Sequence, residues 1–158
     1  MHKTYIYSDA SFSNKHKLGV ASYLILDSEN SSQKLHSFSV KEKNNIRVEF
    51  IALMEALKTL KPKDNKEIIV YTDSRAIKDL LSRRKRLEYL DFKSKKTGNL
   101  LSNTYIYKEF FKIYDTYTPT IYWTKGHQAK KETIIEKNFS KVDKLARKTL
   151  KDLIKNII

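Results

Sequence analysis

The chain has 158 residues, and its 32 Lys and Arg residues outnumber its 18 Asp and Glu residues, which gives a formal net charge of +14. The absence of Cys excludes disulfides, thiolate metal sites and a Cys nucleophile. Without a long apolar run or a signal peptide, we expect a cytoplasmic protein that does not span a membrane. The size is typical of one folded domain, residues 1–158. The charge favours nucleic acid as a partner, although a composition rich in Lys, Asn, Ile and Tyr would by itself produce part of that charge.

Taken in chain order, the apolar patterning predicts an α/β fold. Alternating apolar residues and β-formers predict strands near residues 5–7, 20–26, 35–40, 68–71 and 120–123. Helical periodicity predicts helices over 47–60, over a short segment after 74, over 105–117, and through the apolar positions of 142–157. Short connections make the first three strands an antiparallel meander, and a strand–helix–strand crossover then makes the fourth strand parallel to the first. We therefore predict a five-stranded mixed sheet flanked by helices.

Two carboxylates follow predicted strands that should be neighbours. Asp9 comes after the first strand and Asp73 after the fourth. If these strands are parallel, both side chains emerge at the sheet edge where open α/β sheets place their sites. Either residue alone could instead be a turn or helix-capping Asp.

Two further carboxylates lie on predicted helices. Glu49 falls within the apolar arc of the first helix, where an ionised side chain is costly unless it is paired or binds a metal. The alternative is a first-turn Glu that favours the helix dipole. Asp143 ends the sequence Ser140-Lys141-Val142-Asp143, which matches a capping box, so its local pattern favours a helix start, although a cap residue can also bind a metal.

Carboxylates that converge at one sheet edge would repel one another unless a cation holds them ionised. Their oxygen atoms favour Mg²⁺ or Mn²⁺, and no His or Cys pair with zinc-binding spacing offers an alternative. The sequence therefore predicts a divalent metal site.

Five motifs, in order along nearly the whole chain, resemble type 1 ribonuclease H. They are YSDAS at 7–11, NIRVE at 45–49 with Ala52 and Ala56-Leu57 after it, YTDS at 71–74, WTKGH at 123–127 and VDKLA at 142–146. The resemblance implies an RNase H-like fold and endonucleolytic cleavage of the RNA strand of RNA–DNA hybrids. It further implies that the four carboxylates, Asp9, Glu49, Asp73 and Asp143, bind two Mg²⁺ ions, with Mn²⁺ as a substitute, in a two-metal mechanism.

The same resemblance suggests roles for other residues. His127 matches the histidine of the family's mobile loop, which assists proton transfer or product release, and the segment 128–142 looks longer than is usual there. Asn45 looks like the family's asparagine that contacts 2′-hydroxyls. Arg47 precedes the metal-binding Glu, and Arg75 stands where many relatives have a substrate-contacting Gln. We expect both arginines, like Asn45, to bind the substrate.

Residues 82–99 carry seven basic side chains against two acidic ones, interleaved with aromatic residues. This segment looks like the basic protrusion with which some family members grip the DNA strand, and its alternative is a solvated loop. The substrate-binding candidates here are Arg83, Arg84, Lys85, Arg86 and Lys95.

We expect a monomer that acts on RNA–DNA hybrids. Two alternatives stay open: another nuclease of the same fold that acts on DNA, and a hybrid- or double-stranded-RNA-binding protein with weak or lost catalysis. The complete set of four carboxylates argues against the latter.

Overall fold

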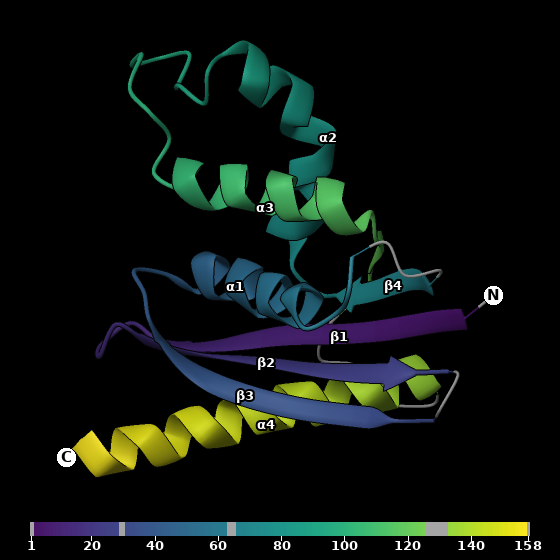
Figure 1. Cartoon of the computed structure of the whole chain (residues 1–158). Helices are drawn as coiled ribbons and strands as arrows, with labels where there is room; N and C mark the ends of the chain where they lie inside the picture. The colour runs from purple at the N-terminus through teal and green to yellow at the C-terminus, as the bar shows by residue number, and fades with distance from the viewer. Residues whose placement is uncertain (1, 29–30, 63–65, 126–132, 158) are drawn as a thin grey trace.

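A five-stranded mixed sheet forms the centre of the computed structural model, which describes residues 2–28, 31–62, 66–125 and 133–157 (Figure 1). The strands are β1 (His2–Ser13), β2 (Leu18–Asp27), β3 (Gln33–Lys41), β4 (Lys66–Thr72) and β5 (Thr120–Trp123). Their order in the sheet is β3-β2-β1-β4-β5. The pairs β1–β2 and β2–β3 are antiparallel, whereas β1–β4 and β4–β5 are parallel. The predicted fold class is confirmed.

Helices cover both faces of this sheet. They are α1 (Asn45–Lys58), α2 (Arg75–Tyr89), α3 (Thr104–Tyr117) and α4 (Ile134–Ile157). α1 packs on β1 and β2 and against α3, and α4 packs on the opposite face along β1, β2 and β3 (Figure 1). The larger core lies on the α1 side and includes Phe50, Leu53 and Phe110, and a smaller one under α4 joins Tyr7 and Leu24 to Phe139 and Val142. Among the described residues, no helix is both long enough and apolar enough to cross a bilayer.

Three predicted boundaries were wrong. β1 extends to Ser13, because its pairing with β2 continues as far as Ser13↔Leu18 after its pairing with β4 has ended. α2 is not short but has 15 residues. α4 begins at Ile134, where the hydroxyl of Thr133 accepts a hydrogen bond from the amide of Glu136 at 3.1 Å. Much of the segment 128–142 is therefore helix, and the apolar contacts of Phe139 under the sheet stabilise it there.

A glycine determines how closely α1 approaches the sheet. A Cβ atom on Gly19 in β2 would lie 2.5 Å from Cγ2 of Val48. Because glycine has no side chain, the first turns of α1 can pack directly on β2. This close packing sets the position of Glu49, the residue after Val48.

Candidate active site

The β1–β4 register brings Asp9 and Asp73 to the same edge of the sheet. The last register pair is Tyr7↔Tyr71, and each aspartate follows two residues later. Asp9 lies within β1 and is 7% exposed, whereas Asp73 is half-buried in the turn between β4 and α2. The sequence prediction for this edge holds, although Asp9 marks the end of the parallel pairing and not the end of its strand.

Glu49 reaches this edge from α1 and is held by two hydrogen bonds. Ser74 Oγ donates to Glu49 Oε2 at 2.5 Å, and Asn45 Nδ2 donates to Glu49 Oε1 at 3.1 Å. Ser74 is also the N-cap of α2, where its hydroxyl accepts from the amide of Ile77 at 3.3 Å. Burial raises the pKa of Glu49, the Ser74 hydrogen bond opposes that rise, and the charge of Asp73 adds to it.

Asp143 comes to the site from the opposite face of the sheet. It lies well inside α4, so the capping-box interpretation of this residue is wrong, because the helix starts at Ile134. Packing of α4 on β1 places Asp143 close enough to Asp9 for the two carboxyl groups to interact. Arg147, one turn further along α4, donates to Asp143 Oδ2 at 2.6 Å. Asp143 is thus positioned by the middle of a helix and does not serve as its cap.

The electrostatics of the site follow from this crowding. Burial, together with the negative charges of Asp73 and Asp143, raises the pKa of Asp9 to about 9, against a smaller opposing effect from the backbone amide of Ala10. Asp9 thus interacts with both Asp143 and Asp73, and Asp73 also interacts with Glu49. We call this row of four carboxylates, in the order Asp143, Asp9, Asp73, Glu49, the carboxylate file. Without a cation, Asp9 holds a proton near neutral pH.

A divalent cation fits the chemistry of this donor set. The file presents only carboxylate oxygens, which are the preferred ligands of Mg²⁺ and Mn²⁺, and a cation would replace the proton on Asp9. In the described part of the chain, no three His, Cys, Asp or Glu side chains are already gathered into a metal site. The carboxylates interact in pairs, as their effects on the pKa values of Asp9 and Glu49 show. Their joint coordination of a metal stays a prediction.

Asn45 carries an unpaired acceptor beside the carboxylate file. A carboxylate can only accept, so the contact with Glu49 must use the Asn45 amide nitrogen. The other end of the amide, Oδ1, is buried and has no hydrogen-bond partner among the described residues. A buried acceptor left unpaired is costly, and a hydroxyl donor from a bound molecule would satisfy it.

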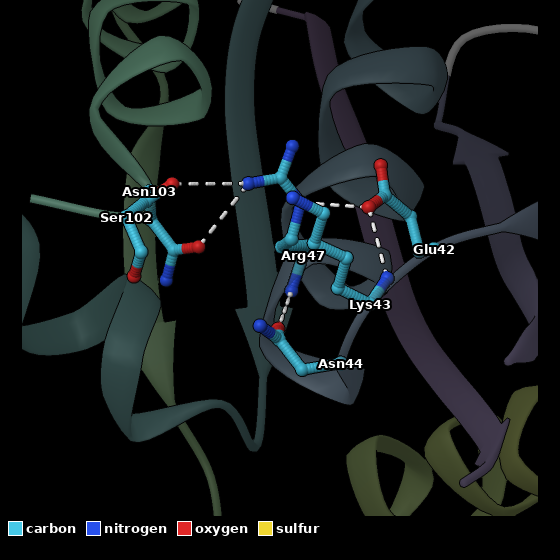
Figure 2. A network of polar contacts seen from close by, with 6 residues as sticks. All are labelled: Glu42, Lys43, Asn44, Arg47, Ser102 and Asn103. Carbon is cyan, nitrogen blue, oxygen red and sulfur yellow. Dashed lines mark hydrogen bonds and ion pairs between the residues drawn. The ribbon is translucent and has the colours of Figure 1, made fainter.

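Arg47 is engaged within the protein, as Figure 2 shows. Its Nε donates to Glu42 Oε1 at 2.7 Å, and its Nη1 lies 3.3 Å from Asn103 Oδ1 and 3.4 Å from the carbonyl oxygen of Ser102. Asn44 caps α1 by accepting from the Arg47 amide at 3.0 Å. These contacts connect the starts of α1 and α3, so the arrangement favours a bracing role for Arg47 over the predicted substrate contact.

The predicted basic protrusion consists of the end of α2 and the loop that leads to α3, and Figure 1 shows it standing away from the sheet. A hollow of about 490 Å³ lies there. The residues that line it are Arg83, Arg86, Leu87, Leu90, Lys93, Ser94, Lys95, Lys96 and Leu101. Lys85 is exposed on α2 nearby.

Arg84 differs from its basic neighbours because its guanidinium is already paired. It donates to both carboxylate oxygens of Asp115 on α3, at 2.6 and 2.7 Å, and to Glu88 at 2.6 Å. Its Cζ also lies 4.6 Å from the ring centroid of Phe111. Arg84 therefore ties α2 to α3, and the contacts favour this role over the predicted binding of a phosphate.

Arg75, the first residue of α2, lies over the indole ring of Trp123, with its Cζ 5.1 Å from the ring centroid. The Nζ atom of Lys78 lies 4.9 Å from the centroid of the same ring. The indole nitrogen donates to the backbone carbonyl of Asp73 at 3.0 Å. Trp123 thus connects β5 to the turn that carries Asp73, a link that the sequence pattern did not indicate.

A sequence model of the RNase H family matches residues 1–151. The chain belongs to the RNase H family. A search of curated proteins finds no match.

Solved structures with this RNase H fold include LC9-RNase H1, described as a type 1 RNase H with the type 2 active-site motif. It has a TM-score of 0.72 and 18% identity, over 92% of this chain and 71% of that chain. Two others are the foamy viral protease-reverse transcriptase. Its complex with dsDNA gives a TM-score of 0.69 and 15% identity over 92% of this chain and 91% of that one. Its complex with RNA/DNA hybrid gives a TM-score of 0.66 and 15% identity, over 93% of this chain and 19% of that chain.

One residue of the β5–α4 region, His127, remains from the sequence predictions for this RNase H chain. His127 lies outside the described residues, so its expected role stays a prediction. Asn138 is buried in α4 and lies close to the hydroxyl of Tyr7. Burial raises the pKa of Tyr7, and the interaction with Asn138 partly offsets the rise. Asn138 thus contributes to the packing of α4 on β1 at Tyr7, which lies two residues before Asp9.

Proposed function

We propose that this RNase H chain is a metal-dependent endonuclease that cuts the RNA strand of RNA–DNA hybrids. The observation that carries the proposal is the buried carboxylate Asp9, which interacts with Asp73 and Asp143 at one sheet edge and has a raised pKa as a result. Structural support comes from the fold shared with a reverse transcriptase whose structure contains an RNA/DNA hybrid.

The four carboxylates, Asp9, Glu49, Asp73 and Asp143, would hold two Mg²⁺ ions, with Mn²⁺ as a substitute. When bound, such a pair supplies an activated water and stabilises the leaving 3′ oxygen. Ser74 and Asn45 hold the Glu49 carboxylate from two sides, and Arg147 holds that of Asp143. His127 would move a proton near the leaving oxygen, or assist product release.

RNA would be recognised through Asn45. Its buried Oδ1 receives no hydrogen bond from the part of the chain that the structure describes. A ribose 2′-hydroxyl can donate one, whereas deoxyribose cannot. Because the same side chain contacts Glu49, the hydroxyl would be read directly beside a metal ligand. Cleavage would thereby be confined to the RNA strand.

The DNA strand would be held by the basic hollow. Arg83, Arg86 and Lys95 line it, and exposed Lys85 and Arg75 extend the positive surface. Arg47 and Arg84 contribute indirectly, because their guanidinium groups are paired within the protein. Each phosphate contact would release a counterion and make the binding sensitive to salt.

The test is incubation of the protein with a hybrid labelled on either strand, with Mg²⁺, with Mn²⁺ or with a chelator. We expect internal cuts in the RNA strand only, in the presence of metal, and none with Asp9→Asn. Binding of the hybrid without any cleavage would contradict the proposal and favour the alternative, a hybrid-binding protein without catalysis. Cleavage of double-stranded DNA would favour another RNase H-fold nuclease.

A further inference from the structure

An open row of tyrosines crosses the α4 face of the sheet and is not used by the proposed reaction. Tyr7, Tyr71 and Tyr122 are register partners on β1, β4 and β5. The rings of Tyr7 and Tyr71 are stacked with centroids 5.1 Å apart and planes at 21°, and those of Tyr71 and Tyr122 with centroids 5.7 Å apart and planes at 26°.

The row passes from buried to exposed along the sheet. Tyr7 is covered by Phe139 and Val142 of α4, whereas Tyr122 is 51% exposed. α4 packs along β1, β2 and β3, and β5 is the last strand of the described sheet (Figure 1). The outer side of Tyr122 therefore has no further strand of that sheet beside it, so one more flat ring could extend the stack.

A shallow hollow of about 430 Å³ lies over this row. Three tyrosines, Tyr5, Tyr71 and Tyr122, contribute to its lining, together with one cationic residue, Lys3, and no acidic residue. The Trp123 ring does not count as a stacking surface, because Arg75 and Lys78 of α2 lie over it. Stacking surfaces next to a positive charge suit a nucleobase and its phosphate.

The hollow lies beside the strand that leads to the catalytic edge. Tyr71 lines it, and Asp73 follows Tyr71 by two residues, a rise of about 6.6 Å along a strand. A nucleotide chain that leaves the row along β4 would therefore run toward Asp73. A second copy of this chain is a poorer occupant, since each copy carries a net charge of +14.

From these contacts we propose that the tyrosine row is a subsite for unpaired nucleotides, with bases stacked on Tyr122 and a phosphate near Lys3. The binding itself is independent of the proposed nuclease function. Its consequence rests on that function: hybrids that carry a short single-stranded extension would be cut in preference to blunt ones.

Binding is tested with a fluorescent eight-nucleotide thymidine strand and an abasic strand of the same length, by anisotropy at fixed salt. The abasic strand reports phosphate contacts alone, including those at the basic hollow, so the ratio of the two Kd values isolates stacking. We expect the intact protein to prefer the thymidine strand, Tyr122→Phe to keep this preference, and Tyr122→Leu to reduce it at least about fivefold. Leu35→Ala, an exposed apolar side chain on the opposite edge strand, is the matched control and should not change the ratio.

A preference that Tyr122→Leu leaves intact would overturn the inference, as would equal binding of both strands by the unaltered protein. Sedimentation of the intact protein tests the other occupant: a dimer that Tyr122→Leu dissociates would make this face a protein interface instead. The nuclease assay compares a blunt hybrid with four hybrids that each carry a single-stranded extension at one of the four strand ends. For at least one of these, kcat/KM should exceed that of the blunt hybrid, and Tyr122→Leu should reduce this preference. Failure of all cleavage with an intact stacking preference would count against the proposed function only.

Discussion

Replacing Asp9 by Asn tests the electrostatic account of the active site most directly. The pKa of Asp9 is raised to about 9 by burial and by Asp73 and Asp143, whereas an unfolded Asp titrates near its ordinary value of about 4. Between these two values the folded protein binds one proton more than the unfolded chain. Stability is therefore greatest below about pH 4 as far as this group is concerned, and it is lost as the pH rises towards 9.

The size of the effect follows from that single proton. One proton of difference lowers the free energy of unfolding by up to about 1.4 kcal/mol for each pH unit. Between pH 6 and pH 8 the metal-free protein should lose up to about 3 kcal/mol, or about 6–12 °C in Tm for a chain of this size. Asn resembles the protonated carboxyl in shape and does not ionise, so this contribution should vanish in Asp9→Asn.

The assay is thermal unfolding followed by circular dichroism at several pH values from 5 to 8, in a chelator and in Mg²⁺. We expect Asp9→Asn to melt above the unaltered protein at pH 8 in chelator, to gain less from Mg²⁺, and to lose cleavage. Asp152→Asn removes an exposed carboxylate of α4 and serves as control. Parallel pH dependences of Asp9→Asn and the unaltered protein would refute the reasoning.

Three further variants distinguish residues that bind the substrate from residues that stabilise the fold. Replacing Arg83, Arg86 and Lys95 together by Gln should raise KM with little change in kcat. It should also flatten the salt dependence of hybrid binding, by about 0.9 in slope for each phosphate that is no longer neutralised, and binding titrations at several salt concentrations would measure this. Arg84→Ala should instead leave KM nearly unchanged and lower unfolding stability by about 1 kcal/mol in denaturant titration; a large rise in KM would restore Arg84 to the binding surface. Asn45→Ala should lower kcat/KM for the hybrid by about tenfold or more and leave Kd for double-stranded DNA unchanged. An unchanged kcat/KM for the hybrid would contradict the proposed contact between Asn45 and the 2′-hydroxyl.

The sheet edge could be predicted from the sequence because its signals are local. Apolar alternation identifies β1 and β4, and a polar residue after such a run is visible without a structure. Glu49 could be singled out because a carboxylate on an apolar helix face is anomalous. The start of α4 was missed because the stabilising contact is tertiary: Phe139 packs against Tyr7 and Leu24, which lie far away in the sequence.

The roles of the arginines could not be predicted for the same reason. Arg47 contacts Asn103 across 56 positions of the chain, and Arg84 contacts Asp115 across 31. A run of basic residues indicates a positive surface, but only the fold shows which guanidinium groups are neutralised by distant partners. In this fold Arg83 and Arg86 line the basic hollow, whereas Arg84 is paired with Asp115.

The contacts around Glu49 would connect the proposed substrate selection to the proposed metal binding through one side chain, Asn45. Asn45 and Glu49 are one turn apart on α1, so their side chains meet on the same face of the helix, and Ser74 holds the other carboxylate oxygen from the start of α2. If a 2′-hydroxyl donates to Asn45 Oδ1, it orders the amide whose other end already fixes Glu49. A hybrid would then complete the hydrogen bonding of the site as it binds, whereas double-stranded DNA would leave Oδ1 buried and unpaired. In the proposed arrangement, discrimination against DNA would arise from an unsatisfied acceptor beside the four carboxylates, and it would need no separate recognition element.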